Sequence, residues 1–132
     1  MRRSILLFGS LLFVAAPAFA ANYEIDPAHT NAQFAVRHLM VSNVRGEFSN
    51  FKGTVQYDPA NFAATKIEAT IEASSLDTRN GERDEHLRKE EFFDVKKFPT
   101  LTFKSKKVVA ASAGKLKVTG DLSIRGVTKE VV

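Results

Sequence analysis

The chain has 132 residues, no cysteine, three histidines and a formal net charge of +4 with histidine neutral. Without cysteine, neither a disulfide framework nor a thiolate metal site can form. The 19 Lys and Arg residues are mixed with 15 Asp and Glu residues instead of forming a basic stripe, which argues against a nucleic-acid partner. We interpret the densest basic run, Lys104, Lys106 and Lys107, as the solvated edge of a strand, where lysine discourages pairing with another chain.

Residues 1–20 have the pattern of a cleaved signal peptide. A basic start is followed by an apolar run over residues 5–16, a break at Pro17 and small residues before a cleavage site after Ala20. The alternative is a membrane anchor, but a spanning helix needs roughly 20 apolar residues and this run is shorter. We therefore expect export, no stable membrane insertion after cleavage, and one domain over residues 21–132.

The first half of that domain predicts two extended regions. Residues 31–39 alternate between two side-chain sets, which is the period-two pattern of a strand. Residues 44–58 alternate as well, but the parity of the apolar positions changes at Ser49-Asn50. A flat strand of this length would span about 50 Å, which is too long for a small domain. We therefore expect a β-bulge at Ser49-Asn50 that bends the strand as a closing sheet requires.

Three further strands are predicted in the second half. Residues 64–73 show the most regular alternation in the chain, and residues 100–109 and 115–125 alternate too. Such one-sided strands are typical of antiparallel sheets with one solvated face. Gly126 begins a hairpin turn, and Val131-Val132 begins a further strand.

A helical insert is predicted between these strands, because residues 74–98 lack the alternation. Either Asn80 or Asp77 could cap a short helix that runs through His86 to about Glu91.

Five strands with short connections and one helical insert predict a mainly β fold, in which an antiparallel sheet curls into a barrel. The inward positions mix large side chains, such as Phe34 and Ile71, with small ones, such as Gly46 and Gly120. Small residues on an inner wall either pack under bulky partners or leave room for a ligand. Alternation leaves both interpretations open.

Several stretches, in order across nearly all of residues 21–132, resemble the YceI family. They are YEIDPAHT (23–30), FAVRHL (34–39), VRGEF (44–48), SLDT (75–78), RDEHLR (83–88), FFD (92–94), FPTLTF (98–103) and GDLSIRGVT (120–128). The resemblance implies an elongated, lipocalin-like antiparallel barrel in the periplasm, with no catalytic residue. Its tunnel would hold a polyisoprenoid, a quinone-like tail or a fatty amide. Family domains continue for about two more strands, so we expect a C-terminally incomplete barrel that stops after the sixth or seventh family strand.

A long isoprenoid needs an apolar tube, in which each buried methylene contributes roughly 0.8 kcal/mol. Phenylalanine suits such a wall, although ordinary core packing is the better interpretation for any single phenylalanine. We expect the lipid to contact Phe34, Val36, His38, Phe48, Phe51, Val55, Ile67, Ala69, Ile71, Phe92, Phe103, Val118 and Leu122.

A polar head group would lie at the mouth of the tunnel. We expect Arg37, Arg45 and Arg83 there, because guanidinium groups bind phosphate and carbonyl oxygens. For Arg83 we favour the alternative that it caps the helix and, with Asp84, His86 and Arg88, pins it across the barrel by ion pairs.

The expected function is therefore binding, storage or transport of a long-chain apolar lipid, with that lipid as the partner and no cofactor. The alternative is a non-catalytic interaction or stress protein of the envelope whose barrel is filled by its own side chains. An enzyme is not expected, because the chain has no Gly-x-Ser-x-Gly elbow and no cysteine nucleophile. A metal site is not expected either, because His29, His38 and His86 are scattered. Homodimer formation stays open.

Overall fold

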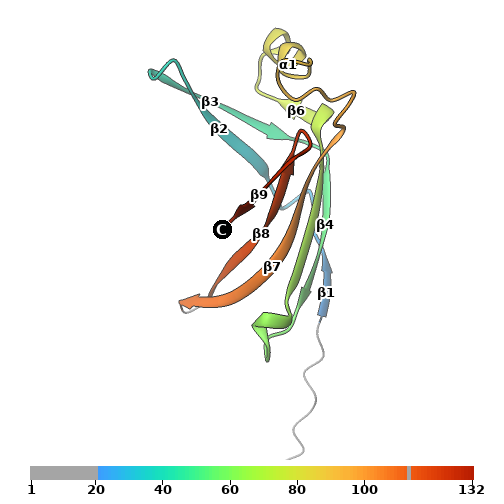
Figure 1. Ribbon diagram of the computed structural model, residues 1–132, viewed down its shortest axis with the longest axis vertical. Coiled ribbons are helices and arrows are strands. Elements are labelled where there is room, and N and C mark those ends of the chain that lie inside the picture. The colour runs from blue at the N-terminus through green and yellow to red at the C-terminus, as the bar shows by residue number, and fades with distance from the viewer. Residues whose placement is uncertain (1–20, 113) are drawn as a thin grey trace, which may run out of the picture.

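The computed structural model describes residues 21–112 and 114–132, so the expected signal peptide lies outside the described residues. Strands dominate the described part, with one α-helix and two 3-10 helices (Figure 1). In chain order the elements are β1 (Ala21–Glu24), β2 (Ala32–His38), β3 (Ser42–Phe48), β4 (Phe51–Tyr57), η1 (Phe62–Ala64), β5 (Lys66–Glu72), η2 (Ala73–Ser75), β6 (Leu76–Asp77), α1 (Gly81–Leu87), β7 (Thr100–Ser112), β8 (Lys115–Ile124) and β9 (Val127–Val131).

The strands form two antiparallel sheets. The larger has six strands in the order β1-β4-β5-β7-β8-β9 and curves strongly, and the smaller has three in the order β2-β3-β6 (Figure 1). The prediction of a mainly β, antiparallel fold is confirmed. Among the described residues the barrel is not closed, because β9 and β2 each end a sheet and do not pair with each other.

A corner, and not the expected bulge, explains the change of parity at Ser49-Asn50. β3 and β4 lie on either side of this dipeptide and belong to different sheets. The Ser49 N–H donates to the Ser75 carbonyl over 3.1 Å, and the Asn50 N–H donates to the Ser75 hydroxyl over 3.1 Å. These bonds satisfy the backbone where the chain leaves one ladder for the other. The bulge prediction was therefore wrong at this point, and an irregularity in register occurs in β7 instead, between Ser105 and Lys107.

The lysine run lies on a central strand, so its interpretation as an edge was wrong. β7 pairs with β5 on one side and β8 on the other. Lys104 pairs with Glu68 over 3.0 Å, while Lys106 contacts Asp121 over 3.1 Å and Glu130 over 3.0 Å. The Glu130 and Asp121 carboxylates raise the pKa of Lys106, and its ammonium links β7, β8 and β9 on the polar face of the sheet.

The last hairpin begins its second strand earlier than expected. Arg125 and Gly126 both have positive φ, 49° and 72°, and form a two-residue loop. Ile124 therefore pairs directly with Val127, and β9 starts there and not at Val131.

The helix is shorter than expected and ends at Leu87 instead of Glu91. Of the two possible caps, Asn80 is the one used: its side-chain oxygen accepts from the Arg83 N–H over 3.0 Å.

The core lies at the end of the molecule nearest α1 and joins the two sheets. Phe48 and Leu76 of the smaller sheet pack with Leu101 of the larger sheet and with Ala73, and all four are buried. Partly buried side chains surround them: Ala32, Phe34, Ile71, Leu87, Phe93 and Val95. The cluster therefore defines an inner face of the six-stranded sheet, the face that carries Leu101 and turns toward β2-β3-β6.

Candidate functional site

The inner face of the six-stranded sheet carries rows of apolar side chains. Strand register places Phe51 opposite Ile71 and Ile71 opposite Leu101, and the next row runs through Gly53, Ala69, Phe103 and Leu122. Side chains opposite each other across antiparallel strands share a face, so these rows form one continuous surface. Eight of the residues expected to contact lipid lie on it, each half-buried: Phe51, Val55, Ile67, Ala69, Ile71, Phe103, Val118 and Leu122.

Two residues of this surface, Ile25 and Lys129, were not predicted from the sequence. Ile25 donates its N–H to the Gly53 carbonyl over 2.9 Å, which places it beside β4 just beyond β1. Lys129 lies opposite Leu122 and brings an ammonium group to the open edge of the apolar row. A strand predicted to begin at Val127 would have placed Val127, Lys129 and Val131 on one face, and Lys129 would then have been expected on this surface.

Small residues on the inner walls lie under aromatic rings. A Cβ added at Gly46 would clash with the Phe34 ring. One added at Gly120 would lie 2.5 Å from the Lys104 carbonyl oxygen and 2.6 Å from the Phe103 ring. At these two positions the small residues therefore pack under bulky partners: glycine is needed for close packing and leaves no room for a ligand.

Phe34 and Phe48 belong to the packed end of the molecule. Their ring centroids are 5.4 Å apart, and Phe48 meets Phe93 edge-on at 5.8 Å. Only 6% of Phe48 is exposed. Both side chains hold the sheets together, and contact with a lipid stays a prediction for them.

Three other predicted lipid contacts lie away from the apolar rows. Val36 and His38 are exposed on β2, toward the tip of the β2–β3 hairpin. Phe92 is exposed and packs edge-on against His86 at 5.0 Å, beyond the end of α1. Their roles in binding a lipid stay predictions.

The predicted head-group arginines do not converge. Arg37 donates to the Met40 carbonyl within its own hairpin, over 3.2 and 3.3 Å. Arg45 helps line an open pocket of about 570 Å³ on the smaller sheet, together with Asp77 and Arg79. Since Arg45 pairs with Ala35, its side chain points away from the face that carries Phe34.

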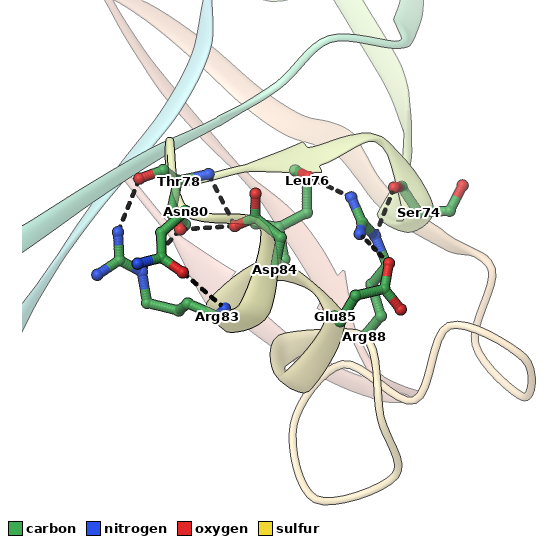
Figure 2. Close-up of polar contacts among 8 residues, drawn as sticks. All are labelled: Ser74, Leu76, Thr78, Asn80, Arg83, Asp84, Glu85 and Arg88. Atoms are coloured by element: carbon green, nitrogen blue, oxygen red, sulfur yellow. Dashed lines mark hydrogen bonds and ion pairs between the residues drawn. The ribbon is translucent and has the colours of Figure 1, made fainter.

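Arg83 belongs to a buried polar cluster that fixes α1 against β6 (Figure 2). The Asp84 carboxylate accepts from the Thr78 N–H over 2.9 Å and from the Thr78 hydroxyl over 2.5 Å. Arg83 donates to the Thr78 hydroxyl and carbonyl oxygens, each over 2.7 Å. These contacts favour the structural interpretation of Arg83 over a head-group role.

Arg88 secures the other end of the same helix (Figure 2). Its guanidinium donates to the Ser74 carbonyl over 3.0 Å, the Leu76 carbonyl over 2.6 Å and the Glu85 carboxylate over 3.0 Å. Helix α1 is thus tied to the chain on both sides of β6, over the packed end of the molecule.

Other candidate chemistry is sparse in the part of the chain that the structure describes. No group of three or more metal-binding side chains occurs there, and no helix among these residues is long and apolar enough to cross a bilayer. His29 bonds to Asp26 over 2.6 Å, and this contact, together with the Ala28 N–H, lowers the pKa of the Asp26 carboxyl. Both side chains are exposed within one turn of chain, where they stabilise the connection after β1.

The sequence of this chain is similar to those of a known protein family. A family model described as YceI-like domain matches residues 23–132. A UPF0312 protein of Vibrio vulnificus is 44% identical over 135 residues, covering 99% of this chain and 71% of the relative. The chain belongs to the YceI-like family.

Solved structures agree with this assignment. The YceI-like chain superposes on BcnA of Burkholderia cenocepacia with a TM-score of 0.76 and 31% identity, over 81% of this chain and 67% of BcnA. A polyisoprenoid binding domain from Saccharophagus degradans, implicated in plant cell wall breakdown, gives a TM-score of 0.60 at 17% identity, over 85% of this chain and 64% of that domain. The second likeness concerns the fold alone.

Proposed function

We propose that this YceI-like protein binds a long-chain apolar lipid, such as a polyisoprenoid, along the inner face of its six-stranded sheet. In this proposal it acts in the bacterial periplasm after cleavage behind Ala20, and it stores or carries the lipid without catalysing a reaction. One observation carries the proposal: the rows of half-buried apolar side chains that cross this sheet from β4 to β8.

The chemistry of the two faces supports the proposal. The outer face carries polar and charged groups such as Thr102, Lys104 and Glu68, two of which form an ion pair. The inner face offers a branched hydrocarbon chain mainly apolar contacts over several strands, with the Lys129 ammonium at its edge. Each methylene removed from water contributes roughly 0.8 kcal/mol, so several isoprene units offset an association cost of about 4 to 15 kcal/mol. The Saccharophagus degradans domain, which shares the fold, is named a polyisoprenoid binding domain, and the proposal takes its ligand class from that name.

A second candidate is an envelope interaction protein whose interior is filled by its own side chains. The rings that lie over Gly46 and Gly120, and the solid cluster around Phe48 and Leu76, favour it at the end near α1. The two candidates differ along the remaining rows, where Leu122 and Val118 are half-buried, whereas Val108, opposite Val118, is only 1% exposed.

Leu122→Asp tests the proposed site directly. We expect it to weaken binding of a fluorescent prenyl probe at least roughly tenfold, because a carboxylate on the apolar row must lose water when the chain binds. Titration of the probe, followed by fluorescence, measures the effect. Thr102→Asp is the matched control: it adds the same charge on the exposed outer face, and its binding should match that of the unmodified protein.

Equal binding by both variants would refute the inner face as the site. A folded, unmodified protein that takes up no prenyl probe at all would favour the filled interior.

A further inference from the structure

The turn of the β2–β3 hairpin has an unusual composition. Leu39 and Met40 both adopt positive φ, 51° and 63°, and the Val41 N–H donates to the His38 carbonyl over 3.2 Å. The loop has three residues, because His38 pairs with Ser42, and its first two positions favour asparagine and glycine because a Cβ disfavours the left-handed region. Two apolar side chains therefore occupy positions where they strain the backbone.

These side chains gain nothing from packing within the described residues. Leu39, Met40 and Val41, which we call the apolar tip, are 77%, 80% and 88% exposed. The tip lies at the end of a hairpin that projects beyond the body of the molecule (Figure 1). Contiguous apolar side chains that are this exposed are typical of an interaction site.

The charge around the apolar tip indicates the kind of partner. No Asp or Glu occurs between Asp26 and Glu47, whereas Arg37 and Arg45 are in the hairpin strands that carry the tip. The Arg37 guanidinium also donates to the Met40 carbonyl, which holds a positive charge directly behind the tip. Apolar side chains in front of basic ones fit the acyl boundary and the anionic head groups of a membrane surface.

We infer that the apolar tip docks the protein onto an anionic lipid bilayer. Leu39, Met40 and Val41 enter the interface to a depth of roughly 5 to 10 Å, while Arg37 and Arg45 meet the head groups. Because no lipid on the inner face is needed for these contacts, docking goes beyond the proposed function and is independent of it.

The test uses the full chain and vesicles of phosphatidylcholine with or without phosphatidylglycerol, with binding measured by cosedimentation. The double variant Leu39→Asn, Met40→Gly removes two apolar side chains and installs the residues that this turn prefers. We expect it to fold at least as well as the unmodified protein and to bind the mixed vesicles at least roughly thirtyfold more weakly. Val109→Asn, which changes an exposed apolar residue on the outer face of β7, should bind as before.

A second pair of variants tests the contribution of charge to vesicle binding. Arg45→Gln should weaken binding to the mixed vesicles roughly fivefold, whereas Lys117→Gln on β8 should have no effect. Binding of the unmodified protein should also fall when phosphatidylglycerol is omitted or salt is raised. Unchanged binding by the double variant overturns the inference. So does a protein that ignores both vesicle types but self-associates through the tip, because the partner would then be a second copy.

Discussion

Asp84→Ala is expected to lower the free energy of unfolding by about 3 kcal/mol. The change removes the acceptor for the N–H and the hydroxyl of Thr78, and Thr78 and Asp84 are only 4% and 7% exposed. A buried donor left without a partner costs about 1 to 3 kcal/mol, and two are affected here. Urea denaturation followed by circular dichroism measures the loss.

Glu85→Ala is the matched control on the same helix. Glu85 forms an exposed ion pair with Arg88, and such surface pairs contribute about 0 to 1 kcal/mol. Equal losses for the two variants would mean that the Thr78–Asp84 contacts do not anchor α1.

Gly120→Val is also expected to lower the free energy of unfolding by about 3 kcal/mol, because the added side chain has too little space. Its Cβ would lie 2.5 Å from the Lys104 carbonyl oxygen, a backbone atom that cannot rotate away, and 2.6 Å from the Phe103 ring. Overpacking of this kind costs about 1 to 3 kcal/mol or more. Thermal and urea denaturation measure the change.

Gly81→Ala provides the comparison, because nothing lies within 4 Å of an added Cβ at this first residue of α1. We expect it to stabilise the protein by about 0.5 kcal/mol, since alanine favours helix more than glycine does. A Gly120 variant as stable as the Gly81 variant would show that the Phe103 ring does not press on Gly120.

The alternation of apolar and polar residues predicted the strands that have one solvent-exposed face. β5 is the clearest case, because Lys66, Glu68 and Glu72 are exposed while Ile67, Ala69 and Ile71 are half-buried, as the period of two requires. β1 has only four residues and β6 only two, which is too short for a period to be recognised. The inner-face residues of the candidate site could be predicted for the same reason that β5 could.

Contacts between the two sheets could not be predicted in the same way. A change of parity at Ser49-Asn50 looks the same in sequence whether the strand bulges or leaves its sheet, and only the pairing of β3 with β6 distinguishes the two. Likewise, the glycines at 46 and 120 alternate like ligand-facing positions. The rings that cover them come from β2 and β7, and the strand register that brings them there depends on tertiary structure.

Native mass spectrometry of the protein, purified without detergent from the bacterial envelope, tests the central claim most directly. We predict a folded protein that carries one apolar chain, released by organic solvent and taken up again when a prenyl lipid is added back. A folded protein that never contains such a chain, and still has the mass of the bare polypeptide after incubation with prenyl lipids, would contradict the account.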